Sequence, residues 1–189
     1  MNKLLDKLIL ILAIIFIAGC STSFEVGDSL YREGQYSEAV DSLRKFVNAN
    51  PNDAVGHYTL ADSLYLKYST DYKNNNANTN DLNLSSMHFA KAIELDPNYA
   101  EAYCQRGVTR LVLGDVAGSK QDYENAIRIK PNLDRVYFNR GYWYEQQGRL
   151  QEAILDYEKY VFISKNNKWR DDAARRIEAL KLKLQLQGK

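Results

Sequence analysis

The sequence predicts an all-α protein, in which four helical hairpins stack into a solenoid and a final helix caps it. Three observations support this prediction. The chain of 189 residues repeats itself at a spacing of 34 residues, glycines and prolines recur at fixed positions of that period, and residues 168–189 carry one apolar helical stripe. Periods of this length are typical of repeat proteins, whose units bury a core by packing on their neighbours.

The first expected element is a short apolar segment at the N-terminus. Lys3 and Lys7 precede an uncharged run, whose core from Leu8 to Phe16 is too short to span about 30 Å of hydrocarbon as a helix. A positive start, a short apolar core and a small-residue end are typical of a signal peptide, here residues 1–19. The alternative is an N-terminal membrane helix that is kept.

The segment Ile17-Ala18-Gly19-Cys20 resembles the lipobox of bacterial lipoproteins. The resemblance implies cleavage before Cys20, lipidation of its sulfur and, through Ser21, the periplasmic face of the outer membrane in a Gram-negative cell. Two or more acyl chains anchor a protein stably. The residues Thr22-Ser23-Phe24-Glu25 predict a capping box, so the first helix is expected to start two residues after the anchor. Lipidation would leave Cys104 without a disulfide partner.

Four repeats follow in the same frame. Gly27, Gly107 and Gly141 are expected where two helices approach closely, because glycine inside a helix otherwise costs about 1 kcal/mol. Gly34, Gly114 and Gly148 are expected to make the turn in three hairpins, and Pro51, Pro97 and Pro131 are expected to end the second helix of the first three repeats. The second repeat holds a dozen extra residues around the Asn-rich segment 70–83, which we expect to be a loop. The predicted repeats are 20–53, 54–99, 100–133 and 134–167.

This order of small, large and proline positions resembles the tetratricopeptide repeat over residues 20–167. The resemblance implies a right-handed solenoid whose first helices line a concave, peptide-binding groove. Carried over position by position, the protein-binding face comprises Phe24, Tyr58, Asp62, Tyr65, Cys104, Val108, Leu111, Phe138, Tyr142 and Glu145. This face lacks the lysine and asparagine clamp by which some family members hold C-terminal carboxylates.

Two alternatives remain for this face. Its aromatic residues can pack on neighbouring repeats, or the C-terminal helix can cover them. Cys104 in particular is expected to be a buried small hydrophobic residue rather than a reactive thiol.

Two arginines occupy positions where the family usually has leucine. Asp122 follows Arg106 by 16 residues, and Asp156 follows Arg140 by the same interval. The first two repeats have neither an arginine nor an aspartate at these positions. The sequence therefore predicts a structural Arg–Asp pair inside each of the last two hairpins, because a half-buried arginine needs a carboxylate. The alternative is that both arginines hold an acidic ligand.

The last element is the capping helix over residues 168–189. Its apolar stripe comprises Trp169, Ala173, Ile177, Leu180 and Leu184. Residues 165–189 have eight basic and three acidic side chains, a net charge of +5. A solvated cap explains these charges, and contact with anionic lipid or another envelope polymer is the alternative.

Several functions are excluded by what the sequence lacks. The net charge of +1 gives no indication of nucleic-acid binding, and no nucleotide loop, nucleophile elbow or metal cluster appears. His57 and His88 fall in different helices without a third ligand. We therefore expect no enzyme, no cofactor, no metal and no small-molecule substrate.

The sequence as a whole predicts a lipid-anchored adaptor or scaffold that binds other envelope proteins at a bacterial membrane. The alternative is an integral subunit of an envelope assembly machine, such as a pilotin for a type IV pilus secretin or an accessory of outer-membrane barrel assembly.

Overall fold

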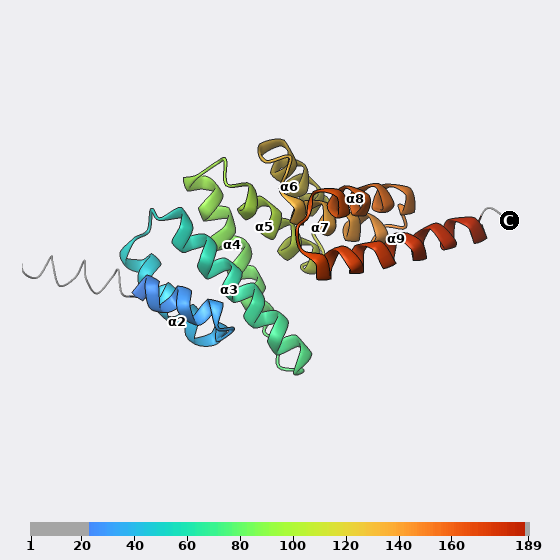
Figure 1. Ribbon diagram of the computed structural model, residues 1–189. Coiled ribbons are helices and arrows are strands. Elements are labelled where there is room, and N and C mark those ends of the chain that lie inside the picture. Colours follow the sequence, from blue (N-terminus) through green and yellow to red (C-terminus); the bar gives the residue numbers. More distant parts are fainter. Residues whose placement is uncertain (1–22, 188–189) are drawn as a thin grey trace, which may run out of the picture. The chain divides into compact units, whose positions relative to one another are not determined.

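The computed structural model describes residues 23–187, which form helices and no strand (Figure 1). The predicted signal peptide, the lipidated Cys20 and the capping residue Thr22 lie outside the described residues. The all-α prediction is confirmed, and the fold is of the tetratricopeptide type. The chain forms two compact units that divide after Pro97, and each is described by itself.

Unit 1 contains two helical hairpins. The first joins a helix over residues 23–32 to α2 (Tyr36–Ala49), and the second joins α3 (Ala54–Lys73) to α4 (Thr79–Leu95). Leu43 of α2 and Leu60 and Leu64 of α3 lie in one buried apolar cluster. The two hairpins therefore share a core.

Unit 2 contains two further hairpins and the final helix. Its helices are α5 (Ala100–Val112), α6 (Val116–Ile129), α7 (Asp134–Gln146), α8 (Leu150–Ile163) and α9 (Asn167–Gln187). The fully buried Tyr123 and Tyr157 belong to one cluster with Ala173, Ile177 and Leu180 of α9. The final helix thus completes the core of unit 2, as a capping helix does.

Helix ends follow the local sequence. Asp53 and Asp115 accept hydrogen bonds from the backbone N–H groups three residues later, and so cap the N-termini of α3 and α6. Helices α2, α4 and α6 each end two residues before a proline, which cannot continue a helix.

The turns inside the hairpins need a left-handed residue. Gly34, Gly114 and Gly148 have φ angles of 80°, 84° and 70°. In the longer second hairpin Asn75 takes this role, with φ of 57°. Asparagine is the residue that tolerates this conformation best after glycine. The turn prediction for the three glycines is confirmed.

The glycines inside the first helices permit close helix packing. A Cβ atom on Gly107 would lie 2.7 Å from the Tyr123 ring, and one on Gly141 would lie 2.9 Å from the Tyr157 ring. One on Gly27 would lie 2.7 Å from Leu43. In each of these three hairpins, a large side chain of the second helix packs directly against a glycine of the first helix.

The expectation of a loop over residues 70–83 is wrong. Helix α3 continues to Lys73 and α4 begins at Thr79, so only residues 74–78 connect them. Helix α3 has 20 residues against 13 in α5, α4 has 17 against 14 in α6, and the connection has five residues against three, which accounts for the extra dozen. An ion pair from Lys67 to Asp81 joins the lengthened helices.

Candidate functional site

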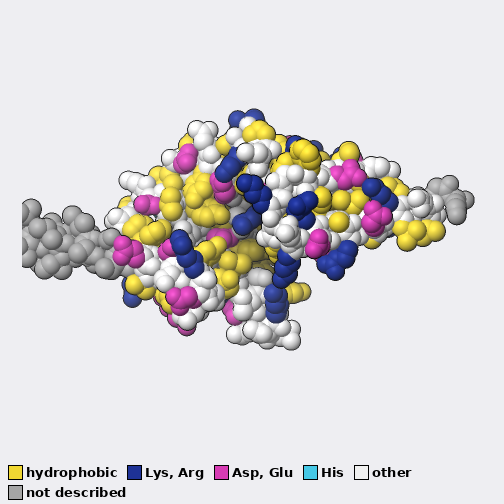
Figure 2. All heavy atoms as spheres, viewed as in Figure 1, with side chains coloured by type: hydrophobic (Ala, Val, Ile, Leu, Met, Phe, Trp, Pro, Cys, Tyr) yellow, Lys and Arg dark blue, Asp and Glu magenta, His cyan; other side chains and the backbone are white. Residues whose placement is uncertain are grey.

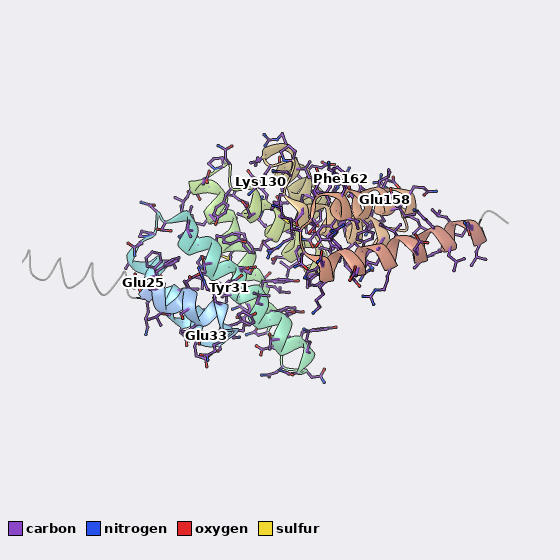
Figure 3. The ribbon with its side chains drawn as sticks, in the orientation of Figure 1. Glu25, Tyr31, Glu33, Lys130, Glu158 and Phe162 are labelled. Atoms are coloured by element: carbon purple, nitrogen blue, oxygen red, sulfur yellow. The ribbon has the colours of Figure 1, made fainter. Side chains whose placement is uncertain are left out.

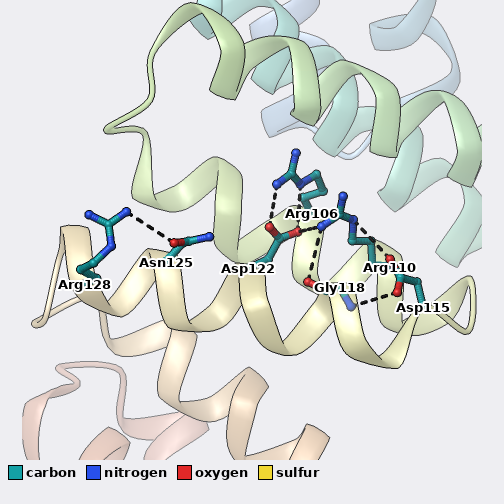
Figure 4. A network of polar contacts seen from close by, with 7 residues as sticks. All are labelled: Arg106, Arg110, Asp115, Gly118, Asp122, Asn125 and Arg128. Carbon is teal, nitrogen blue, oxygen red and sulfur yellow. Dashed lines mark hydrogen bonds and ion pairs between the residues drawn. The ribbon is translucent and has the colours of Figure 1, made fainter.

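An Arg–Asp pair joins the two helices of each hairpin in unit 2. The Arg106 guanidinium donates two hydrogen bonds to Asp122, at 2.8 Å from Nε and 2.6 Å from Nη2 (Figure 4). Arg140 binds Asp156 in the same way, at 2.7 and 2.8 Å. Both carboxylates are buried, so each pair meets the need of a buried charge for a partner with matched geometry.

Arg110 also binds Asp122, which the sequence analysis missed. Its Nη1 lies 2.9 Å from Asp122 Oδ2, and its Nε lies 3.6 Å from the carboxylate of Asp115. Arg110 comes four residues after Arg106, and residues at this interval lie on the same helix face. This spacing could have predicted that Arg110 also reaches Asp122. These arginines are used by carboxylates of their own hairpin and are not left to grip an acidic ligand.

In unit 2, Asp156 stabilises the charged form of Arg140. Burial by itself lowers the pKa of Arg140, but the hydrogen bond and the charge of Asp156 outweigh burial and raise the pKa above its usual value. The Arg140 guanidinium therefore stays charged, and we assign the pair to stability.

The second hairpin has two histidines where the third and fourth have tyrosine and aspartate. His57 Nδ1 lies 2.9 Å from His88 Nδ1, and His57 Nε2 lies 3.1 Å from the carbonyl oxygen of Pro51. Because a carbonyl only accepts, His57 carries its proton on Nε2, and its Nδ1 accepts a hydrogen bond from His88. Tyr137 likewise donates to the carbonyl of Pro131, so His57 has a packing role.

In unit 1 the predicted inner face is partly used by the fold. Phe24 is half-buried, with its ring 4.9 Å from the ring of Phe46 on α2. The hydroxyl of Tyr31, which is labelled in Figure 3, donates a 2.6 Å hydrogen bond to Asp62. Tyr58 and Tyr65 of α3 are also half-buried. Parts of these aromatic rings face solvent, because no described side chain buries them fully.

Asp62 itself is not a surface residue. Only 2% of Asp62 is exposed, since Tyr31 from the helix over residues 23–32 covers it and binds its carboxylate. The prediction that Asp62 contacts a partner is wrong for the protein in this conformation. The role of Asp62 is to link α3 to the first helix of the preceding hairpin. Tyr31 is a residue whose role the sequence analysis missed.

Cys104 of unit 2 is also removed from the predicted binding face. It is 1% exposed, and the Asn139 amide donates to its sulfur at 3.4 Å. Its burial agrees with the expectation of a small hydrophobic residue. Val108 and Leu111 are half-buried and pack against the core of unit 2, so this stretch of α5 offers only the outer edges of apolar side chains.

The capping helix covers the predicted face of α7. The Trp169 ring meets the Phe138 ring edge to face at 5.6 Å, and Arg176 lies 5.6 Å from the Tyr142 ring. Arg176 also binds Glu145 at 3.0 Å. The alternative that the C-terminal helix covers this row therefore holds for Phe138 and Glu145, whereas Tyr142 contacts Arg176 but stays 40% exposed.

The contact between α7 and α9 has a polar centre. Glu145 accepts a 2.8 Å hydrogen bond from the Tyr157 hydroxyl in addition to its ion pair with Arg176. Burial, the hydrogen bond and the charge of Glu145 raise the pKa of Tyr157. Burial lowers the pKa of Arg176, but its bonds to Asp172 and Glu145 more than offset this. A partner peptide on α7 would have to displace this network.

Residues 23–187 contain no group of three His, Cys, Asp or Glu side chains that could hold a metal ion. In the same stretch, no helix has the length and apolar character that crossing a membrane requires.

Family comparison agrees with this description. Tetratricopeptide repeat models match residues 22–53, 88–121 and 134–167. The chain therefore belongs to the tetratricopeptide-repeat proteins, a class of scaffold for contacts between proteins.

Three similar proteins carry the same repeat. Over 102 residues the chain is 35% identical to RNA polymerase II-associated protein 3 of Xenopus tropicalis, a match that covers 53% of the chain and 13% of that protein. A crystal structure of MamA has 25% identity and a TM-score of 0.63, covering 75% of this chain and 76% of that one. The first repeat domain of Spaghetti (RPAP3), solved with the HSP90 peptide SRMEEVD, has 21% identity and a TM-score of 0.59, covering 69% and 94%.

Proposed function

We propose that this protein is a lipid-anchored adaptor, which binds segments of other envelope proteins at a bacterial membrane. The observation that supports the binding role is the row of half-buried aromatic side chains on the first helices of unit 1, at Phe24, Tyr58 and Tyr65. The anchor is supported by the short apolar segment that ends at Cys20.

The chemistry of this row favours an apolar or basic partner segment. Two inner-face positions of unit 1 hold acids, Asp28 in an ion pair with Arg32 and Asp62 beneath Tyr31. An acidic peptide such as the SRMEEVD bound by the RPAP3 domain would meet like charge here, and the chain has no lysine and asparagine clamp at these positions. We therefore propose recognition through aromatic contacts, which supply large apolar area at a protein interface.

The test is a cross-linked pull-down of the full chain from detergent-solubilised envelopes. Tyr58→Ala together with Tyr65→Ala is expected to reduce partner recovery at least tenfold, which corresponds to about 1.4 kcal/mol. Val55→Ala is the matched control, because Val55 lies on the same helix and is 51% exposed. Equal recovery by both variants would contradict the aromatic site. A single stoichiometric complex would instead indicate an integral assembly subunit.

The anchor needs its own test. Mass spectrometry of the mature chain is expected to find an acylated Cys20 as the first residue, and Cys20→Ser is expected to release the protein from the membrane fraction. An intact, unmodified N-terminus would contradict the anchor without affecting the binding site.

A further inference from the structure

Helix α9 has a second apolar stripe that unit 2 does not use. Ala173, Ile177 and Leu180 are buried in the core and Leu184 is half-buried. The same spacing recurs two residues later at Arg175, Ala179, Leu182 and Leu186. A shift of two residues turns about 200° around a helix, so the second stripe lies on the opposite side.

This second stripe is exposed at its apolar end. Leu182 is 57% exposed and Leu186 is 64% exposed. Figure 2 shows hydrophobic side chains toward the C-terminal end of α9. Because the body of unit 2 packs on the other side of α9, no described residue of unit 2 blocks the approach of another helix to this face.

The charges beside the stripe indicate what kind of helix fits. In heptad terms Ala179 and Leu186 take position a and Leu182 takes position d, which puts Glu178 at g and Lys183 at e. Both charged side chains are exposed, and neither has a partner among residues 23–187. In a parallel two-stranded pair, position g of one helix faces position e of the other five residues later.

We infer that this face of α9 pairs in parallel with α9 of a second copy of the chain. Glu178 of each copy would then lie against Lys183 of the other, and the two copies of Leu182 would meet at the two-fold axis. An antiparallel pair would place like charges together, which is unfavourable. An anionic lipid surface is a poorer occupant, because Glu178 borders the apolar stripe.

The pairing is short and therefore weak in solution. Three apolar residues per helix form the seam, and upstream of them Arg175 takes the next d position, where it binds Asp172 at 3.2 Å. A shared membrane would raise the effective concentration of the two copies. The pairing itself does not depend on the proposed anchor, so it can be tested without lipid.

The first test is disulfide cross-linking of the full chain at high protein concentration. The variants carry Cys20→Ser, so the introduced cysteine and the buried Cys104 are the two cysteines of the chain. Leu182→Cys is expected to form a covalent dimer at least five times faster than Leu155→Cys. Leu155 lies on α8 of the same unit and is 64% exposed, which makes it a matched control. Equal rates for the two variants would overturn the proposal.

The second test is a charge swap, measured by sedimentation equilibrium. Glu178→Lys is expected to weaken association by about tenfold, since two attractive pairs become repulsive, and Lys183→Glu added to it is expected to restore association. Failure of the double variant to recover would overturn the parallel register. Flotation of the wild type on phosphatidylglycerol vesicles, lost in Leu182→Ser with Leu186→Ser, would show a lipid-binding face and also overturn it.

Discussion

The second and fourth hairpins solve the same packing problem with different chemistry. In the hairpin of α7 and α8, Arg140 on the first helix binds a buried Asp156 on the second. In the hairpin of α3 and α4, Leu60 and His88 take those positions, and His88 bonds to His57 instead. The same position in the hairpin thus accepts either an Arg–Asp ion pair or a contact between two imidazole rings.

The difference lies in how each hairpin responds to protonation. A guanidinium stays charged at every working pH, and a bidentate bond fixes its geometry. The His57–His88 contact requires that one of the two facing Nδ1 atoms carry no proton. Burial, together with electrostatic repulsion from His57 and Arg44, lowers the pKa of His88 to about 4. The stability of unit 1 is therefore expected to depend on pH, whereas the stability of unit 2 is expected to depend on the presence of both Arg140 and Asp156.

The largest expected effect is loss of one member of the charged pair. Arg140→Leu leaves Asp156 buried and unpaired, which is expected to lower the free energy of unfolding of unit 2 by about 3 kcal/mol. Adding Asp156→Ala should recover much of that loss. Urea unfolding followed by tryptophan fluorescence reports unit 2, because both tryptophans, Trp143 and Trp169, lie in it.

An exposed ion pair of the same unit gives the control. Lys130 binds Glu101 at 2.6 Å with both side chains at least a third exposed, so Lys130→Ala is expected to cost under about 1 kcal/mol. If Arg140→Leu costs no more than Lys130→Ala, or if the double variant is no more stable than the single one, the pair does not stabilise the hairpin.

The next effect is the acid sensitivity of unit 1. The folded chain binds a proton at His88 less readily than the unfolded chain, whose histidine has the ordinary pKa of 6.5. Stability from this group is therefore complete above pH 6.5 and is lost as the pH falls toward 4. The loss is expected to reach about 2 kcal/mol, allowing for partial exposure of the ring.

Hydrogen exchange between pH 7 and pH 4 can resolve this loss. Amides of α3 and α4 should lose protection in that window relative to amides of α7 and α8. His88→Gln keeps a donor for His57 but does not titrate, and it is expected to flatten the dependence. A slope that is unchanged in this variant would assign the acid sensitivity to other groups.

A smaller effect concerns the spacing of the two helices in a hairpin, compared between the third hairpin and the second. Gly107→Ala would place a Cβ 2.7 Å from the Tyr123 ring and 3.2 Å from the backbone oxygen of Ser119, whereas the second hairpin already has Ala61 at this position. Overpacking is expected to exceed the gain in helix propensity and to destabilise unit 2 by about 1 to 2 kcal/mol in the same fluorescence assay. A stabilised variant would mean that the helices can move apart freely.

The smallest effect concerns the turns. Gly148 has φ of 70°, where the second hairpin uses Asn75. Gly148→Ala is expected to cost about 1 kcal/mol, and Gly148→Asn about half of that, because asparagine tolerates the left-handed region better. Thermal melts of the two variants beside the wild type measure this order. Equal melting temperatures for both would contradict it.

Contacts inside a hairpin were predictable from the sequence. Gly107 and Asp122 recur 34 residues later as Gly141 and Asp156. The residues that form each contact therefore occur in both repeats, and their common period identifies them. The Asn-rich segment 70–83 was not predictable in this way. It occurs once, and its low apolar content is also compatible with the exposed ends of two long helices.

The sequence by itself determined the repeat, the glycine turns, the proline stops and the Arg–Asp pairs, because these depend on neighbours at fixed intervals along one or two helices. Only the tertiary structure decided which inner-face residues remain accessible. Tyr31, from the first helix of the preceding hairpin, covers Asp62, and Trp169 and Arg176 of α9 contact Phe138 and Glu145 of α7. Val108 takes the position of Asp62 in the next repeat, and α9 lies outside the repeats, so neither contact recurs with the period and both are set by how whole helices pack.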